Sequence, residues 1–262
     1  MRCQKYKIDD AELTVDTEEH KLLSVKNLSN YKRDIHIPEF MEDGTKICGI
    51  GEDCFSGKWG IVTFSDSIKD VESYAFSDVC ADTLVWPASV LEIPGDCFES
   101  CHIGIVKGLE NVLRVSSGAF TRVVINTLVW PSLAKNIPCK CFKYADIKDL
   151  SGLDGVINIE PHAFWGSKIK HIKWPQSVKS IPMGCFFCSE IESVTGVENV
   201  VSIGAHAFEY SKLKSLDLFT NNVIMIEAHA FRGVDPSNIV IPYYMDPETF
   251  NTFFDPKVKQ VL

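Results

Sequence analysis

The chain has 262 residues, of which 45% are hydrophobic and 23% charged, a composition that excludes a wholly disordered protein because the apolar residues suffice to form a core. No run of about 18 apolar residues occurs, so the sequence predicts no transmembrane helix. The net charge of −9 disfavours nucleic acid and anionic membranes as partners, because an acidic surface repels phosphates.

Residues 1–48 are predicted to form a β-rich N-terminal cap. Two strand-like runs, at residues 12–15 and 21–25, are separated by charged residues and fit the strands of hairpins. The opening residues lack the apolar segment of a signal peptide, so we expect no signal peptide in this chain. Asn27-Leu28-Ser29 is a formal glycosylation sequon, a pattern short enough to arise by chance.

An internal repeat of 22 residues dominates the rest of the chain. Its marker is a small residue, Ala or Cys, followed by Phe, and successive markers are 21 to 23 residues apart. The marker phenylalanines are Phe55, Phe76, Phe98, Phe120, Phe142, Phe164, Phe186, Phe208 and Phe231. Nine occurrences at one spacing predict about nine stacked units over residues 49–242.

Each unit has further apolar residues at fixed distances after its marker Phe. They fall 5, 8 and 10 residues later, as Ile169, Ile172 and Trp174 do after Phe164. This spacing predicts a strand at about positions +6 to +10, with +8 and +10 facing the core and +7 and +9 facing solvent. The strands of successive units are predicted to form one parallel sheet on a concave side.

Alternate units differ at position +10. Trp86, Trp130 and Trp174, each followed by Pro, alternate with Gly108, Gly152 and Gly196. We expect each Trp ring to lie over the Gly of a neighbouring unit, where the missing side chain leaves room. After the last unit, residues 243–262 are predicted to form a C-terminal cap with a short helix at about 247–254, since Pro247 suits a first helical turn.

With these units in place, the chain resembles the BspA-like leucine-rich-repeat proteins. The matching stretches include IEPHAFWGSKIKHIKWP at residues 159–175 and SIGAHAFEYSKLKSLDL at residues 202–218. The resemblance implies a β-dominated repeat solenoid of the α/β type, right-handed and with a parallel concave sheet. It also implies a protein at the bacterial surface that binds host or partner proteins.

The cysteines occupy two kinds of position. Cys54, Cys97, Cys141 and Cys185 replace Ala before the marker Phe, so we expect them to be small core residues. Cys80 and Cys101, in adjacent units, are close enough for a disulfide, although free thiols are the favoured interpretation. The sequence Cys185-Phe-Phe-Cys188 has the spacing of half a zinc site but no second pair, so we expect no metal there. Free thiols favour a reducing compartment.

Three histidines share the position two residues before the marker Phe: His162, His206 and His229. Neighbouring units place His206 and His229 about 5 Å apart. The favoured interpretation is that they are polar turn residues, and the alternative is a metal-dependent or hydrolytic enzyme that uses this edge. The sequence contains no G-x-S-x-G, H-E-x-x-H, P-loop or G-x-G-x-x-G motif.

Two groups on the solvent side of the predicted sheet are candidate binding residues. Val85, Ile105 and Val129 form an apolar stripe on three consecutive strands. Lys170, His171 and Lys173 form a basic spot that suits an acidic partner. Both groups also have an ordinary interpretation, because Val and Ile suit any strand and a small basic spot is commonly just solvated.

The sequence therefore favours a non-enzymatic protein-interaction scaffold, adhesin-like and monomeric, that binds a protein partner on the sheet. It predicts no cofactor and no membrane insertion. A structural spacer within a larger surface assembly is a further alternative. The family resemblance favours the cell surface and the free cysteines favour the cytoplasm, so the compartment stays open.

Overall fold

The computed structural model describes residues 2–218, 223, 225–240 and 253. The chain divides into two compact units, residues 1–134 and 135–262, and each is described by itself. Both are stretches of β-solenoid with parallel strands, which confirms the predicted fold class. The C-terminal cap expected over residues 243–262, with its helix at about 247–254, lies outside the described residues apart from residue 253.

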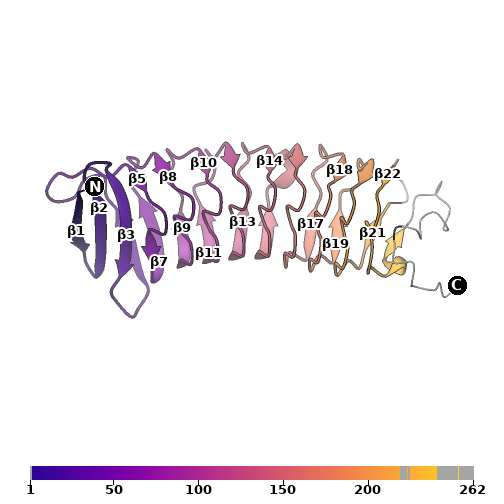
Figure 1. Cartoon of the computed structure of the whole chain (residues 1–262), viewed down its shortest axis with the longest axis horizontal. Helices are drawn as coiled ribbons and strands as arrows, with labels where there is room; N and C mark the ends of the chain where they lie inside the picture. Colours follow the sequence, from indigo (N-terminus) through magenta and orange to yellow (C-terminus); the bar gives the residue numbers. More distant parts are fainter. Residues whose placement is uncertain (1, 219–222, 224, 241–252, 254–262) are drawn as a thin grey trace. The chain divides into compact units, whose positions relative to one another are not determined.

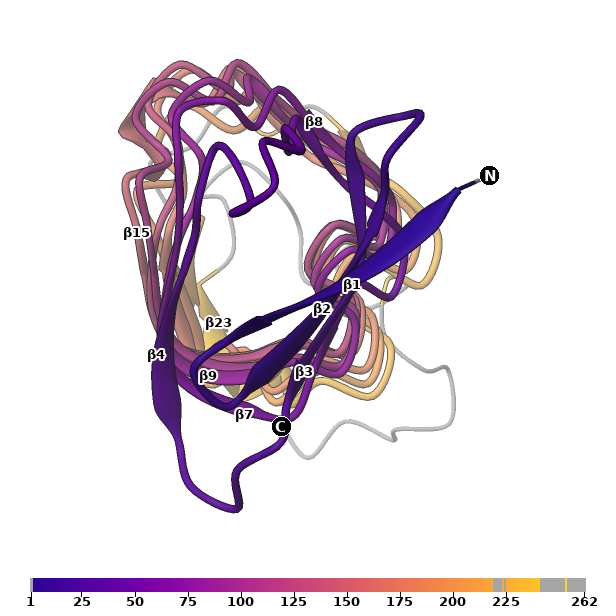
Figure 2. The same cartoon turned by 90° about the vertical axis from the view of Figure 1, so that its left-hand side faces the viewer.

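The first unit begins with an antiparallel sheet, as the predicted β-rich cap requires. Its strands are β1 (Cys3–Ile8), β2 (Ala11–Asp16) and β3 (Lys21–Asn27). The free edge of β3 then pairs in parallel with β5 (Gly49–Ile50) and β6 (Phe55–Ser56) of the first coil. Figure 2 views this end of the unit, with β1, β2 and β3 in front of the coils. The cap thus covers the end of the solenoid with a hydrogen-bonded sheet, which protects that edge from other strands.

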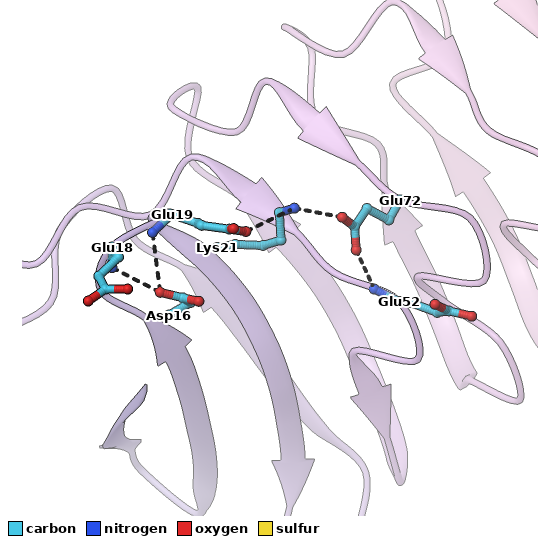
Figure 3. A network of polar contacts seen from close by, with 6 residues as sticks. All are labelled: Asp16, Glu18, Glu19, Lys21, Glu52 and Glu72. Atoms are coloured by element: carbon cyan, nitrogen blue, oxygen red, sulfur yellow. Dashed lines mark hydrogen bonds and ion pairs between the residues drawn. The ribbon is translucent and has the colours of Figure 1, made fainter. Parts of the chain in front are cut away.

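A polar network fastens the cap to the first coils (Figure 3). Lys21 Nζ lies 2.6 Å from the carboxylate of Glu72, which also accepts the backbone N–H of Glu52 at 3.0 Å. This contact lowers the pKa of Glu72 and raises the pKa of Lys21. Beside it, the buried carboxylate of Asp16 accepts two backbone N–H groups of the turn that leads into β3.

The parallel sheet of the first unit contains five strands: β4 (Arg33–Ile37), β7 (Lys58–Phe64), β9 (Cys80–Val85), β11 (His102–Lys107) and β13 (Val124–Val129). They pair in that order, and Figure 1 shows β7, β9, β11 and β13 side by side. The sheet starts at β4, which lies upstream of the solenoid boundary expected at residue 49. Away from this sheet, two-residue strands pair rung to rung: β8 (Asp70–Val71) with β5, and β10 (Glu92–Ile93) with β12 (Arg114–Val115).

The second unit repeats this pattern with shorter strands after the first. Its sheet strands are β15 (Asp146–Ser151), β17 (His171–Lys173), β19 (Ser193–Thr195), β21 (Leu216–Asp217) and β23 (Ile239–Val240). Its two-residue strands are β14 (Asn136–Ile137), β16 (Asn158–Ile159), β18 (Ser180–Ile181), β20 (Ser202–Ile203) and β22 (Met225–Ile226). The helical segments of the described part are two short 3-10 turns, η1 (Leu153–Gly155) and η2 (Pro236–Asn238).

The longer sheet strands span positions +4 to +9 after the marker Phe. They therefore begin two residues earlier and end one residue earlier than the expected range of +6 to +10. The end of each strand has a physical cause. In the Trp-Pro units, Pro87 and Pro131 have no N–H to continue the ladder. In the alternate units, Gly108 and Gly152 turn the chain with φ of 78° and 82°, outside the strand region. Position +10 is therefore the first residue after the strand.

Stacked phenylalanines form the centre of both units. Phe142, Phe164, Phe186 and Phe208 are fully buried, and successive rings lie 5.2–5.3 Å apart with interplanar angles of 13–14°. The backbone N–H of each of these residues donates to a carbonyl of the next rung, at 2.7–3.0 Å. Side-chain stacking and backbone pairing therefore occur at the same residue and set one register for the coils.

The tryptophans of the alternating pattern pack differently from the expectation. The Trp86 ring lies against Phe76 and Phe98, with centroids 6.1 and 5.8 Å apart, and not over Gly108. Its Nε1 donates to the carbonyl of Val90 at 2.9 Å. Gly108 instead approaches the backbone of Trp86, since a Cβ on Gly108 would lie 2.7 Å from the Trp86 carbonyl oxygen. The alternation therefore reflects a close approach of two main chains.

The cysteines before the marker Phe are core residues, as predicted. Cys54, Cys97, Cys141 and Cys185 are at most 1% exposed, and burial raises the pKa of each thiol. All ten cysteines of the chain lie in its described part and are free thiols. The possible Cys80–Cys101 disulfide is therefore absent there, and the Cys101 thiol donates to the carbonyl of Phe76.

Truncation of one stacked ring tests the central role of the ladder. Phe164→Ala should reduce the free energy of unfolding by about 3–5 kcal/mol, because it removes a buried ring and leaves a cavity between two stacked neighbours. Phe164→Leu, which keeps most of the volume, should cost at most about 1.5 kcal/mol. Urea denaturation of both variants measures the difference. Equal losses would contradict this expectation, because they would show that the site requires the ring itself and not only its volume.

Alkylation tests the assignment of the thiols. Brief treatment of the native protein with iodoacetamide should modify the exposed Cys3 and Cys188 first. Cys54, Cys97, Cys141 and Cys185 should react only after unfolding in guanidinium, because burial both shields them and disfavours the thiolate. Peptide mass spectrometry reads the pattern, and rapid modification of Cys97 or Cys141 in the native state would contradict it.

Candidate functional site

The outward side of the parallel sheet in the first unit is termed here the strand face. Along each strand the side chains alternate, as predicted. Val106 and Leu128 are buried, whereas Ile105, Lys107 and Val129 between or beside them are exposed. Burial of alternate residues fixes the register, because a slip by one residue would turn the core side chains to solvent.

The three residues of the predicted apolar stripe lie on β9, β11 and β13, on the same face but in two rows. Ile105 lies in register between Thr83 and Thr127 of the neighbouring strands. Val85 lies in register with Lys107, in the other row. Ile105 is 38% and Val129 55% exposed, whereas Val85 is half-buried. The apolar side chains thus form a zigzag in which β-branched threonines fill part of the intervening surface.

The structure adds Ile61 of β7, which the sequence analysis missed. Ile61 pairs with Thr83 and is 43% exposed on the strand face. It was missed because the step from Phe55 to Phe76 is 21 residues, so a fixed count from Phe55 falls on Val62, which is buried. A count backwards from Phe76 would have found it. We define the apolar patch as Ile61, Val85, Ile105 and Val129.

A hollow of about 510 Å³ opens at one end of the apolar patch. Ile105 and Val129 contribute to it from the strands, and the loops that follow contribute Leu109, Trp130 and Pro131. Lys107 and Glu110 are its charged lining residues. An apolar depression with a few charged groups is the usual form of a site that receives an anchoring side chain.

Gly108 shapes this hollow. Its φ of 78° turns the chain out of β11, and only glycine adopts this conformation without strain. The same residue lets the main chain approach the carbonyl of Trp86, where a Cβ would be 2.7 Å away. The loop with Leu109 and Glu110 therefore starts at a fixed angle from the sheet.

The predicted basic spot is on β17 and the residue before it, and its charges have acidic neighbours. Lys170 Nζ lies 3.3 Å from Glu192, and Lys173 Nζ lies 3.1 Å from Asp154. His171 Nδ1 lies 2.9 Å from the hydroxyl of Ser193. Glu192 is in turn bound by Lys214, and hydrogen bonds from Lys214 and Lys170 lower its pKa. Compensation by these neighbours weakens the field that an acidic partner would feel, so binding at this spot stays a prediction.

The histidines occupy turns, and the backbone explains why. His162, His206 and His229 have φ of 61°, 59° and 58°, a left-handed conformation that His, Asp and Asn adopt more readily than most residues. The rings of His206 and His229 are stacked with centroids 5.4 Å apart, close to the predicted separation. His206 Nδ1 contacts the carboxylate of Glu209, which also lies 3.4 Å from an Arg232 nitrogen.

Within the described part of the chain, no three His, Cys, Asp or Glu residues are grouped so that they could hold a metal ion. The thiols of the Cys185–Cys188 pair have different surroundings, since Cys185 is buried and Cys188 exposed. The sequon residue Asn27 donates its amide to the carbonyls of Tyr31 and Lys58, at 3.0 and 2.6 Å. Its side-chain nitrogen is therefore engaged in holding the turn before β4.

Comparison with known proteins supports the repeat architecture. The sequence matches the family model of the BspA type leucine rich repeat region in 6 copies, over residues 33–148 and 113–238. No curated protein matches it. No helix in the described residues is long and apolar enough to cross a membrane.

Solved structures with a similar fold include a leucine rich cell surface protein from Faecalibacterium prausnitzii A2-165, which is 19% identical with a TM-score of 0.52. That match covers 92% of this chain and 77% of the other. The pneumococcal vaccine antigen PcpA is 14% identical, with 88% and 79% of the chains covered and a TM-score of 0.42. A leucine-rich repeat protein from Bacteroides ovatus ATCC 8483 is 15% identical, with 97% and 98% covered and a TM-score of 0.31. At these identities the likeness concerns the fold alone.

Substitution of two glycines separates backbone strain from steric conflict at the hollow. Gly44→Ala should cost about 1–2 kcal/mol, because Gly44 also has a positive φ but open space around it. Gly108→Ala should cost more, since its Cβ would also collide with the Trp86 carbonyl. Urea denaturation measures both. Equal losses would show that the close approach at Gly108 relaxes without cost.

Proposed function

Because the chain belongs to the BspA-type leucine-rich-repeat family, we propose that its strand face binds a protein partner through the apolar patch. The observation that supports this most is the hollow of about 510 Å³ beside Ile105 and Val129. Adjacent exposed apolar residues with such a depression are a common feature of protein–protein interfaces.

The construction of the strand face favours tight recognition. Each strand is hydrogen-bonded on both sides by its neighbours, from β7 to β11. The indole of Trp130 is anchored by a hydrogen bond from its Nε1 to the carbonyl of Ala134 at 2.9 Å. A partner that binds this surface orders few side chains, and the entropy cost of association is therefore small.

The proposal is for a non-enzymatic scaffold. The main alternative, a metal-dependent or hydrolytic enzyme that uses the His206 and His229 edge, has less support, because a metal site normally needs three or more ligands and no such group occurs among the described residues. The other alternative, a structural spacer, does not require the apolar patch. The patch therefore supports a binding role over a purely structural one.

We extend the proposal to an adhesin-like role at a cell surface. The family and the F. prausnitzii cell surface protein of similar fold support it. The ten free thiols favour a reducing compartment instead. A capture experiment must therefore include both extracellular matrix proteins and cytosolic lysate.

Two lysines on the apolar patch should abolish capture of the partner. The immobilised protein is incubated with matrix proteins and with lysate, and bound proteins are identified by mass spectrometry. Val85→Lys with Val129→Lys should weaken saturable capture at least about tenfold, because two charges would be buried in the interface. The melting temperature should stay nearly unchanged, since Val129 is exposed and a lysine at the half-buried position 85 can extend its ammonium group into solvent.

A matched control uses Leu91→Lys with Leu113→Lys. These residues are 48% and 49% exposed, in the same unit but beside the two-residue strands β10 and β12. The control should retain capture. A photo-crosslinking residue at position 129 should label the partner, whereas one at position 113 should not. Unchanged capture by the Val85/Val129 variant would reject the patch as the binding surface.

A further inference from the structure

A second hollow lies in the other unit, on the turns around the marker Phe residues instead of on the strands. It has a volume of about 340 Å³ and is termed the aromatic hollow. Its lining residues are His162, Trp165, Met183, Phe187, His206 and Glu209. The three turns that build it belong to the units of Phe164, Phe186 and Phe208.

Aromatic rings give the hollow its apolar side. The Trp165 ring lies 5.5 Å from the ring of His162 and 5.9 Å from that of Phe187, which meets it edge to face at 81°. The ammonium of Lys143 lies over Trp165, 4.6 Å from the ring centroid. The rings therefore support one another, and the site keeps its shape without a ligand.

Glycines of the following turns fix the rings in place. A Cβ on Gly184 would lie only 2.3 Å from His162, and a Cβ on Gly166 would lie 2.3 Å from Tyr144, which adjoins Trp165. Both glycines also have positive φ. Any other residue at these positions would therefore meet both a steric conflict with the neighbouring ring and backbone strain. Each ring thus reaches across to the next turn and occupies space that only glycine leaves.

The lining of the hollow is mainly apolar, and its polar groups include His206 and Glu209 on the turn of Phe208. The carboxylate of Glu209 is buried, with the side chain 5% exposed, and contacts His206 Nδ1 and Arg232. Because Nδ1 of His206 is engaged by Glu209, its Nε2 is the ring nitrogen available to a ligand. The His206 side chain is 42% exposed, so this nitrogen is within reach of solvent.

The repeat by itself does not require these residues. In the unit of Phe98, the residues that correspond to His162, Trp165 and Tyr144 are Asp96, Glu99 and Ser100. The buried Phe is identical in both places and the turns have the same left-handed residues. The aromatic hollow is therefore a feature of this part of the chain and not a consequence of solenoid packing.

We propose that the aromatic hollow binds a sugar ring of a carbohydrate. A pyranose has C–H groups on its ring faces and hydroxyls at its edge, so it can stack on Trp165 and Phe187 while one of its hydroxyls hydrogen-bonds to His206 Nε2, which Glu209 orients. An aliphatic side chain of a protein would fill the apolar part of the hollow but would offer no hydrogen-bond partner to His206 Nε2. The chemistry of the lining thus favours an amphipathic ring.

The protein contains its own reporter for this test. Trp59, Trp86, Trp130 and Trp174 are at most 2% exposed, whereas Trp165 is partly exposed. Acrylamide quenching of the native protein therefore reports mainly on Trp165. The probes are chitohexaose, cellohexaose and mannohexaose, each titrated to about 10 mM, where a site with a Kd of about 1 mM is close to saturation. At least one should shield Trp165 saturably.

Calorimetric titration of variants then locates the site. Trp165→Ala and Phe187→Ala should each weaken binding of that oligosaccharide about tenfold. Tyr31→Ala, which removes a 78% exposed aromatic from the first unit, should leave it unchanged, as should the Val85/Val129 double lysine variant. Thermal unfolding verifies that each variant is folded.

Three outcomes would overturn the proposal. They are no saturable shielding by any of the three oligosaccharides, binding that Trp165→Ala and Phe187→Ala leave intact, and shielding by a phenylalanine-containing peptide that lacks tryptophan without shielding by a sugar. Loss of partner capture by the strand-face variant is independent of all three. Failure here and failure of the proposed protein-binding function can therefore be told apart.

Discussion

Stacking of one phenylalanine per coil is the interaction on which the rest of this structure depends. Within residues 142–208 the rings stand 5.2–5.3 Å apart, slightly more than the spacing of about 4.8 Å between paired strands. The N–H of the same residue donates to the next rung, so the aromatic column and the backbone ladder repeat together. A unit with a different number of residues must therefore place the difference in a loop. The 21-residue step before Phe76 shows this, since it shifts the strand by one position while the rings of Phe55 and Phe76 still lie 5.2 Å apart.

This shared register separates the residues that build the fold from those available for function. Positions 0, +5 and +8 are used for the core, together with the small residue before Phe, a fully buried position that takes Ala163 in one unit and Cys185 in the next. Strand positions +7 and +9 and turn positions −2 and +2 lie mostly at the surface and vary, and position +1 ranges from the buried Glu209 to the partly exposed Trp165. Both sets stand on a hydrogen-bonded backbone, which holds their side chains at nearly constant spacing. A rigid and variable surface of this kind suits recognition, because little conformational entropy is lost when a ligand binds.

The sequence predicted the features that repeat and missed those that depend on two coils together. The period, the buried cysteines and the outward direction of Ile105 and Val129 follow from spacing alone, and the structure confirms them. The role of Gly108 does not, because its constraint is the carbonyl of Trp86 in the preceding coil. The compensation of Lys170 by Glu192 was missed for the same reason. Each residue was interpreted within its own unit, whereas residues about 22 positions apart are the ones in contact.

The aromatic hollow extends this reasoning to the turns. Its rings occupy positions that the sequence analysis treated as connections, and only the three-dimensional register shows that His162 overlies Gly184 and Trp165 meets Phe187. His162 and Tyr144 adopt left-handed backbone angles, as residues at the equivalent turns of other units also do, so the backbone does not explain the choice of aromatic side chains. The interior does not require aromatic residues there, since Asp96 and Ser100 occupy the equivalent turns with the same backbone. Side chains that cluster where the core is indifferent to them are explained by a ligand more readily than by stability. On the strand face the exposed valines and isoleucines also suit β-strands, so there it is the hollow beside Ile105 and Val129 that supports binding.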